Sequence, residues 1–356
     1  MQKTTRPKRR VACIALAVAS ALALTACGGS DSGEANELNL YAWAGEVPDS
    51  VIEAFEKETG ISVNVDTFDS NETMIAKLSA GNTGYDIVEP SQYAVQNLAG
   101  QNLVDPIDYS RVQGMDNVMD KFVNPGFDPE NKHAVPWVWG TTGLLYNQAC
   151  TKAPLTSWNS LFDPAYRGKI YMLDNMLASY IVGLQSTGSS ATSTDEAEIE
   201  RATEKLLQQK PLLAGYNSTN YYDLVAAGDA CASLAWGGSS VGKVVAANPD
   251  VKYTLPVEGG TLWVDSFSIA KGAPHPDAAY QWLNFVLRPE VGAMATNDGS
   301  LATTNQAAQT LITDPSVREN PAIFVSDDQL RKAEFILDPG EAMKYYQDGW
   351  TRIKAS

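Results

Sequence analysis

Residues 38–88 alternate between two hydrophobic patterns, and this alternation limits the folds open to the chain. The segments 38–43 and 61–65 place apolar side chains at every second position, as strands do. The segments 48–59 and 71–80 place them on one helical face, and a glycine follows each. A short apolar run at 85–88 ends before a proline. This order predicts a β-α-β-α-β unit with a parallel sheet, and therefore an α/β protein.

The carboxyl ends of these predicted strands carry candidate binding residues. Ligands of open parallel sheets bind beyond the carboxyl ends of the strands. That position holds Trp43, Ala44 and Gly45 after the first strand, and Ser91 and Tyr93 after the third. We therefore expect one binding rim that contains these residues.

A later stretch, TLWVDSFSIA at 261–270, alternates like a strand and breaks its alternation once, near Asp265. Trp263 and Asp265 lie two residues apart, so they would share one face of the strand. An indole ring attracts an organic ammonium ion by roughly 0.5–2 kcal/mol, and a carboxylate supplies the counter-charge. From these residues alone, the pattern is as consistent with a site for a cationic amine as with an edge strand whose Asp265 faces water.

The N-terminal residues have the features of an export signal. MQKTTRPKRR is basic, residues 11–24 are apolar but too few to span a bilayer as a mature helix, and 24–27 (LTAC) is similar to the lipobox of bacterial lipoproteins. We expect removal of residues 1–26 as a signal peptide, a lipid on Cys27, and a flexible tether at 27–37. A cut after residue 26 that leaves a free Cys27 thiol is the alternative.

Charge and length bound the class of protein. Residues 1–26 contain five of the 26 basic residues and none of the 42 acidic ones, so the remaining chain carries a net charge of −21. Such a surface repels nucleic acid and tolerates a cationic ligand. About 330 residues after the signal exceed what one hydrophobic core commonly supports, so we expect two domains. No second hydrophobic run reaches transmembrane length.

Four cysteines are present. Cys13 lies in the predicted signal and Cys27 in the predicted lipidation position. The remaining two, Cys150 and Cys231, would lie outside the cytoplasm, so we predict one disulfide between them. Two buried free thiols are the alternative.

The second half of the chain also mixes strands and helices. Residues 134–147 are aromatic and apolar without helical spacing, which predicts an extended crossing into a second unit. A predicted strand at 231–236 ends at Trp236. Helical patterns occur at 196–209, where we expect a solvated helix, and at 277–287.

Nine segments occur in the same order in the spermidine/putrescine-binding proteins of bacterial ABC importers, which the chain resembles over nearly all of its length after the signal. These segments are LYAWAGEVP (40–48), FEKETGISV (55–63), SNETMIAKL (70–78), YDIVEPSQY (85–93), VPWVWGTTGLLYN (135–147), TSWNSLFDPAYRGKI (156–170), LAWGGSS (234–240), VEGGTLWVDSFSI (257–269) and WLNFVLRPEV (282–291).

The resemblance implies a type II periplasmic-binding-protein fold, with a ligand cleft between two α/β lobes that close by a hinge. It implies that residues 38–138 with 264–309 form lobe 1, and 139–263 with 310–356 form lobe 2. It also implies a monomer without a cofactor or chemistry of its own. Such a protein binds a small organic amine outside the cytoplasm and delivers it to a permease driven by an ATPase.

Carried over position by position, the resemblance implies aromatic walls around the ligand, a polar contact from Ser91, and a pairing of Asp265 with an amine nitrogen. The full set of expected ligand-binding residues is Trp43, Glu46, Ser91, Tyr93, Asp174, Asn175, Trp236, Trp263 and Asp265.

The chain departs from the family pattern at both ends of the implied ligand. The family has Thr-Glu after the tryptophan of the first strand, whereas this chain has Ala44-Gly45, with Glu46 displaced by one. Ala178 falls in the region of a second expected acid, and Ser300 or Leu301 stands where a tyrosine is expected. Each unpaired ammonium group in a cleft costs several kcal/mol. We therefore expect a shorter diamine, or a small amine with an uncharged far end, rather than a long triamine.

Three other classes of function are weaker alternatives. The two histidines, His133 and His275, lie beside turn residues without metal-ligand spacing, and no nucleophile motif is present, so we expect no catalysis. Adjacent tyrosines at 221–222 and 345–346 suggest ferric iron, but their helical patterns favour packing of one ring of each pair. A purely structural surface lipoprotein would leave aromatic rings uncovered at the strand ends.

Overall fold

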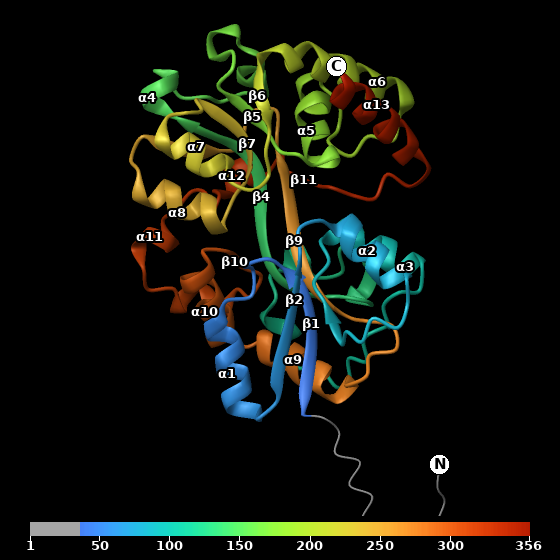
Figure 1. Ribbon diagram of the computed structural model, residues 1–356. Coiled ribbons are helices and arrows are strands. Elements are labelled where there is room, and N and C mark those ends of the chain that lie inside the picture. The colour runs from blue at the N-terminus through green and yellow to red at the C-terminus, as the bar shows by residue number, and fades with distance from the viewer. Residues whose placement is uncertain (1–35) are drawn as a thin grey trace, which may run out of the picture. The chain divides into compact units, whose positions relative to one another are not determined.

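The computed structural model describes residues 36–356 (Figure 1). The predicted signal peptide, Cys27 and most of the predicted tether lie outside these residues. Among residues 36–356, no helix combines the length and apolar character needed to cross a bilayer.

Strands β1 (Glu37–Trp43), β2 (Ser62–Phe68) and β3 (Ile87–Val88) run parallel, with β1 in the centre. Helix α1 (Asp49–Thr59) connects β1 to β2, and α2 (Asn71–Ser79) connects β2 to β3. Gly60 ends α1 in a left-handed conformation with φ of 71°, and the Ser70 side chain caps α2 by accepting from the Thr73 N–H group. The predicted β-α-β-α-β unit is confirmed.

Two long antiparallel strands, β4 (Val135–Asn147) and β9 (Thr261–Ile269), pass through the middle of the fold (Figure 1). β9 also pairs with β3, and β4 with β7 (Ala232–Trp236), so the pair joins the N-terminal strands to the later ones. The predicted crossing at 134–147 is confirmed. The β4–β9 register shifts between Pro136 and Val138, opposite Ser266 and Asp265, where the sequence pattern of β9 breaks.

The later part of the sheet is again parallel. β5 (Ile170–Met172) lies between β7 and β6 (Leu213–Tyr216), while β8 (Val251–Thr254) pairs antiparallel with β4. Helices α5 (Met176–Ser186), α6 (Glu196–Gln209) and α13 (Met343–Ala355) pack on one another. The remaining elements are α3 (Gln92–Gly100), α4 (Gln148–Thr151), α7 (Tyr221–Ala227), α8 (Ser239–Ala247), α9 (Pro276–Val286), α10 (Pro289–Gly299), β10 (Ala302–Thr303), α11 (Pro315–Arg318), α12 (Asp327–Leu330) and β11 (Glu334–Phe335).

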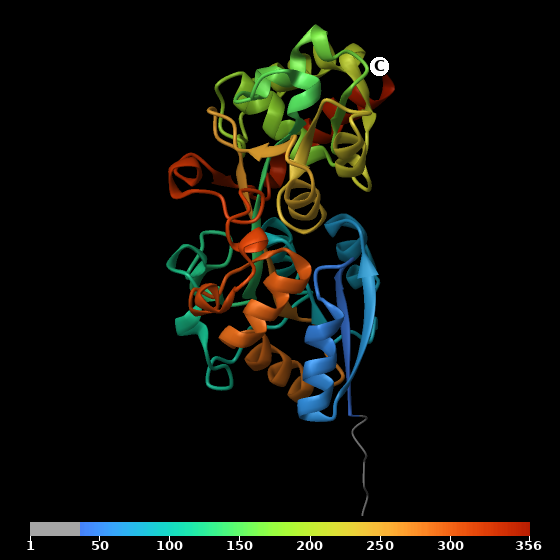
Figure 2. The same cartoon turned by 90° about the vertical axis from the view of Figure 1, so that its left-hand side faces the viewer.

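Separate hydrophobic cores define two lobes. One core surrounds the fully buried Trp137 and Trp282, where α9 and α10 lie beside α1 although far from it in sequence (Figure 2). Another surrounds Trp158 and Tyr180, between α5, α6 and the strands near them. A smaller core around Met74 lies between β1, β2 and α2. This is the two-lobed α/β arrangement expected from the sequence.

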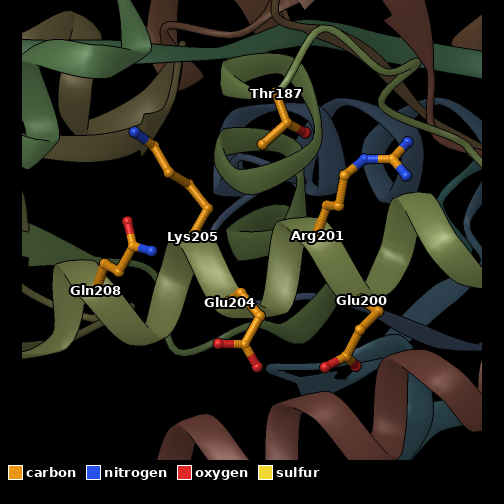
Figure 3. Close-up of a pocket in the computed structure, with 6 residues that line it drawn as sticks. All are labelled: Thr187, Glu200, Arg201, Glu204, Lys205 and Gln208. Atoms are coloured by element: carbon orange, nitrogen blue, oxygen red, sulfur yellow. The ribbon is translucent and has the colours of Figure 1, made fainter.

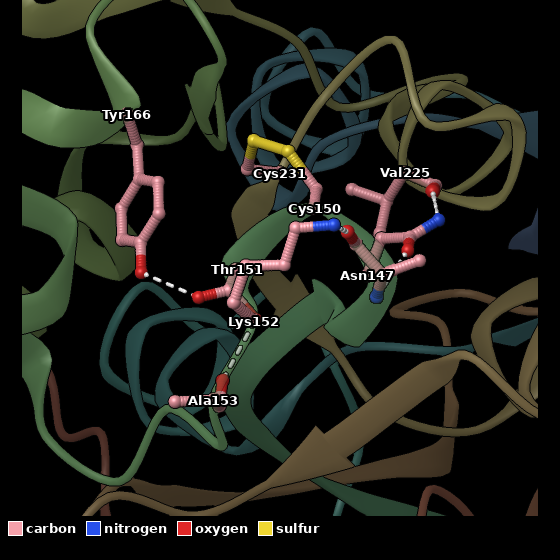
Figure 4. Close-up of a disulfide and its surroundings, with 9 residues drawn as sticks. Asn147, Cys150, Thr151, Lys152, Ala153, Tyr166, Val225 and Cys231 are labelled. Atoms are coloured by element: carbon pink, nitrogen blue, oxygen red, sulfur yellow. Dashed lines mark hydrogen bonds between the residues drawn. A yellow bond between two sulfur atoms is a disulfide. The ribbon is translucent and has the colours of Figure 1, made fainter.

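A disulfide joins Cys150 in α4 to Cys231, which directly precedes β7, with Cα atoms 5.3 Å apart (Figure 4). The Asn147 N–H group donates to the Cys231 carbonyl at 2.9 Å, and the Asn147 side chain donates to the Val225 carbonyl at 3.0 Å. The end of β4 and the start of β7 are therefore held together by covalent and hydrogen bonds.

One secondary-structure prediction needs correction. Residues 196–209 form α6 as predicted, but the helix is not solvated on all sides. Ile199, Ala202 and Leu206 are buried, because α6 packs between α5 and α13. Apolar residues at intervals of three and four positions produce this buried stripe within a highly charged sequence.

Candidate functional site

Asp265 of β9 is buried and bound by one hydroxyl group. Its exposed fraction is 3%, and its Oδ1 accepts a hydrogen bond from the Ser91 hydroxyl at 2.5 Å. Ser91 also forms an isolated antiparallel bridge with Asp265, and the Ser266 N–H group donates to the Pro90 carbonyl at 3.1 Å. The turn after β3 is thus fixed against β9 at the point where the register of β9 shifts.

Ser91 occupies the N-cap position of α3 without capping the helix through its side chain. A serine in this position commonly accepts a bond from the first turn of the helix. Here the hydroxyl donates to Asp265 instead, and the neighbouring Gln92 side chain accepts from the Val264 N–H group at 3.1 Å. The start of α3 therefore orients β9 and its carboxylate.

Glu46 reaches Asp265 by way of a tight turn. The Glu46 N–H group donates to the Trp43 carbonyl at 3.3 Å, and Gly45 has φ of 82°. Glycine at the third position of such a turn adopts positive φ without steric strain. The Ala44-Gly45 pair, where the family has Thr-Glu, thereby brings the Glu46 carboxyl group beside Asp265.

Glu89, at the carboxyl end of β3, is a third acid in this cluster. It is fully buried; its Oε2 accepts from the Trp43 N–H group at 3.0 Å, while its Oε1 has no hydrogen-bond partner among residues 36–356. The sequence analysis did not identify Glu89. An acid two positions before Ser91, at the carboxyl end of a parallel strand, was the available signal.

All three carboxyl groups have raised pKa values, and the charge of Asp265 contributes to the shift of both glutamates. Burial, then the charges of Asp265 and Glu89, raise the pKa of Glu46 well above its usual range. Burial, then the charge of Asp265, does the same for the pKa of Glu89. Burial raises the pKa of Asp265 to about 6, although the bond from Ser91 opposes this shift.

No basic side chain neutralises this cluster. Among residues 36–356, no lysine, arginine or histidine nitrogen lies within 4.0 Å of a carboxylate oxygen of Glu46, Glu89 or Asp265. Within the same part of the chain, no group of three or more His, Cys, Asp or Glu residues is arranged to hold a metal ion. Among the described residues, the cluster therefore has neither a counter-cation nor a metal-binding arrangement.

Three tryptophans lie on strands β1, β7 and β9. Trp43 ends β1 and contacts Phe68, with ring centroids 4.6 Å apart. Trp263 pairs with Gly140 of β4, and Trp236 pairs with Thr142, so Trp263, Trp236 and Asp265 share one face of the β4–β9–β7 sheet. All three residues are partly exposed, and the indole N–H group of Trp263 has no hydrogen-bond partner among residues 36–356.

Gly140 makes room for the Trp263 ring. A Cβ atom at position 140 would lie 2.2 Å from Cζ2 of Trp263. Glycine is therefore required there if the indole is to lie flat over β4.

Tyr93 contacts both lobes. Its half-buried ring packs against the core around Met74 and the core around Trp158, and its hydroxyl donates to Oε1 of Glu72 at 3.2 Å. Burial, followed by the charge of Glu72, raises the pKa of Tyr93. The ring stays neutral at physiological pH and presents an apolar wall between the lobes.

Asp174 and Asn175 have other partners. Asp174, with half of its side chain exposed, pairs with Lys354 of α13 at 2.7 Å. Asn175 caps α5 by accepting from the Ala178 N–H group at 2.9 Å. Their predicted roles as ligand contacts stay predictions, as do those of the other sequence-derived residues.

Two further positions at which the chain departs from the family pattern, Ala178 and Ser300, lie at the ends of helices. Ala178 is buried in the first turn of α5. Ser300, with φ of 58°, ends α10, and its carbonyl accepts from the Ser239 N–H group at 2.6 Å.

The tyrosine pairs at 221–222 and 345–346 have structural partners. The Tyr221 hydroxyl accepts a hydrogen bond from the backbone N–H group of Trp236 at 3.3 Å. The Tyr346 hydroxyl donates to the Ser193 carbonyl at 2.6 Å. One ring of each pair is buried. Both buried phenols therefore support packing, as the helical patterns predicted.

A shallow hollow elsewhere in the molecule has a different character. It lies on α6 and is lined by Thr187, Glu200, Arg201, Glu204, Lys205 and Gln208 (Figure 3). Glu200 and Glu204 point one way from the helix and both bind Arg352 of α13. The acids of this hollow already have a cation, unlike those beside Asp265.

Comparison with known proteins identifies the family. The family described as bacterial extracellular solute-binding protein matches residues 50–325. The chain belongs to this family. This solute-binding protein is 33% identical over 339 residues to the spermidine/putrescine-binding periplasmic protein of Salmonella typhimurium, covering 95% of this chain and 96% of that protein.

Further relatives agree with this assignment. The putrescine-binding periplasmic protein of Escherichia coli is 32% identical, covering 92% of this chain and 94% of its own length. The solved structure of a spermidine/putrescine ABC transporter protein from Listeria monocytogenes superimposes with a TM-score of 0.83 at 31% identity, covering 90% of this chain and 99% of that one. The fold is that of a periplasmic binding protein, and the relatives are substrate-binding proteins of ABC transporters, not enzymes.

Proposed function

We propose that this solute-binding protein captures a small organic amine, of the putrescine or spermidine kind, with Asp265 as the counter-charge. One observation carries the proposal: Glu46, Glu89 and Asp265 lie together beside Trp43, and no cation of residues 36–356 pairs with them. Burying negative charge without a counter-ion is unfavourable, and an ammonium group from a ligand would supply that counter-ion.

The aromatic residues fit the same ligand. The methylene chain of an amine would lie against Trp43, Trp236 and Trp263, whose rings are partly exposed. The indole faces attract a neighbouring ammonium ion, and Tyr93 would cover the ligand where it contacts both lobes. The relatives, which are spermidine/putrescine-binding and putrescine-binding periplasmic proteins, support this class of ligand.

A shorter amine fits better than a long triamine. Asp174 is neutralised by Lys354, and Asn175 uses its side-chain oxygen to cap α5. In contrast, the carboxyl groups of Glu46, Glu89 and Asp265 have no ion-pair partner among residues 36–356, and they lie together. A putrescine-sized diamine, or another small cationic amine, would therefore leave no distant ammonium without a partner.

We further propose that the protein works outside the cytoplasm, anchored to the outer face of the cell membrane by a lipid on Cys27. From there it would deliver its ligand, as a monomer, to the permease and ATPase of an ABC importer. The lobe boundaries expected from the sequence, 38–138 with 264–309 and 139–263 with 310–356, belong to the same proposal. The family description and the lipobox-like 24–27 support it.

A thermal-shift panel tests the proposed ligand class. Putrescine, spermidine, choline and arginine are each added to the protein without its signal peptide. A ligand at a hundredfold excess over its dissociation constant stabilises the folded state by about 2.7 kcal/mol, so a cleft ligand is easily detected. Stabilisation by putrescine supports the proposal, whereas no shift with any organic amine contradicts it.

A further inference from the structure

Glu46 has a buried carboxyl oxygen without a partner. Its Oε2 is shielded from solvent and has no hydrogen-bond partner among residues 36–356, and Asp265 lies beside it. Asp265 accepts from the Ser91 hydroxyl, which favours the ionised form of Asp265. An ionised Glu46 would lack solvation on Oε2 and would be repelled by Asp265, so the ligand-free protein favours the neutral form of Glu46.

Glu89 is a second proton carrier in the same place. Its Oε2 accepts from the Trp43 N–H group, but its buried Oε1 has no partner among residues 36–356. An ionised carboxylate in that position lacks solvation on one oxygen and is repelled by Asp265. Burial and this repulsion raise the pKa of Glu89, so the ligand-free protein favours its neutral form.

The groups that face these acids share one sign of charge or have none. Asp265 faces them from β9, and Tyr93 and Glu72 lie beyond Asp265, on α3 and α2. β1 contributes only the Trp43 N–H group to Glu89. Among residues 36–356, no basic side chain forms an ion pair with any member of the cluster. The proton is thus the only positive charge that the described residues offer it.

We propose that amine capture is an exchange reaction, in which the ammonium groups of the ligand replace protons held by Glu46 and Glu89, and these protons pass to solvent. Each exchange leaves a carboxylate beside an ammonium ion and conserves charge in the cleft. Glu89 is thereby a specificity-determining residue, because it favours a ligand that brings a second positive charge. The inference depends on the proposed amine-binding function.

Calorimetry in two buffers counts the protons. Putrescine and butylamine, which share a four-carbon chain but carry two and one ammonium groups, are titrated into the protein near neutral pH in phosphate and in the zwitterionic buffer MOPS. The difference in binding heat between the buffers gives the number of protons released. We expect putrescine to release about one more proton than butylamine, and Glu89→Gln to abolish that difference.

Controls separate charge from structure. Glu46→Gln tests the other proton carrier and should release about one proton fewer than the wild type when putrescine binds. If Glu89→Gln does not fold, this variant alone decides whether proton release accompanies amine binding. Glu204→Gln removes a carboxyl group from the exposed hollow on α6 and should match the wild-type proton count. Amine binding with equal heats in both buffers would overturn the exchange and leave the proposed function intact. If no amine binds, the proposed function fails and the exchange with it.

Discussion

Two groups of acids in this protein have opposite electrostatic environments. On α6, Glu200 and Glu204 are exposed and bind Arg352, and the hydrogen bond from Arg352 lowers the pKa of Glu200. Beside Asp265, burial of the carboxyl groups and the charge of Asp265 raise the pKa values of Glu46 and Glu89. Glutamate side chains thus have an ion-pair partner on α6 and none among residues 36–356 beside Asp265.

The difference lies in where the counter-ion comes from. Glu200 and Glu204 join α6 to α13, and Arg352 of α13 supplies their cation. The acids beside Asp265 have no cation among residues 36–356, although the fold holds them in place through Ser91, Gly45 and the Trp43 N–H group. Under the proposed function, the ligand supplies the missing positive charge.

The largest expected effect comes from Asp265→Asn. Removing one charge of a buried ion pair commonly costs about 2–5 kcal/mol, so putrescine should bind at least about thirtyfold more weakly. Isothermal titration calorimetry measures the change. Unchanged affinity in Asp265→Asn would show that the amine does not bind at this carboxylate.

Gly140→Ala should disturb the site through packing alone. The new methyl group would collide with the Trp263 ring, and overpacking of this kind commonly costs about 1–3 kcal/mol. Urea denaturation should show lower stability, and calorimetry weaker amine binding. The control is Gly215→Ala in β6, where the nearest side-chain atom would lie 3.7 Å away, and which should leave amine affinity unchanged.

Trp263→Ala should weaken binding less than Asp265→Asn does. The indole face contributes about 0.5–2 kcal/mol to a neighbouring ammonium ion, and Asp265 stays in place. Titration with putrescine gives the affinity. A loss larger than that of Asp265→Asn would mean that apolar contact, not charge, dominates recognition.

The smallest effect is expected on α6. Arg352→Ala removes the cation from Glu200 and Glu204, but exposed ion pairs contribute about 0–1 kcal/mol. Denaturation should show a slight loss of stability, and putrescine affinity should not change. A marked loss of binding would contradict the separation between the two groups of acids.

Local patterns predicted much of the fold. The alternation at 38–43 and the glycine stops at positions 60 and 81 indicated the first β-α-β-α-β unit, because these signals act within a few residues. The long crossing at 134–147 was evident from its continuous apolar character. The buried face of α6 was misjudged, because its many charges concealed the spacing of Ile199, Ala202 and Leu206.

The site was only partly visible in the sequence. Trp43, Ser91 and Asp265 stand at strand ends, and the structure brings them together around Glu46. Glu89 was missed because nothing in the local sequence distinguishes it from an ordinary polar residue at the end of a short strand. The partner of Asp174 could not be foreseen, since Lys354 lies 180 positions away and no local pattern connects them.

Thermal unfolding at two pH values tests the central claim, that Glu46, Glu89 and Asp265 bind a cation supplied by the ligand. Raised pKa values favour the protonated acids in the ligand-free folded protein. The stability that these acids contribute is therefore present below the ordinary carboxyl pKa values near 4, and it is lost as pH rises through about 6 and above. Putrescine should therefore raise the melting temperature much more at pH 8 than at pH 5, because only the ionised acids bind an ammonium ion. An equal shift at both pH values, or a larger one at pH 5, would contradict the account.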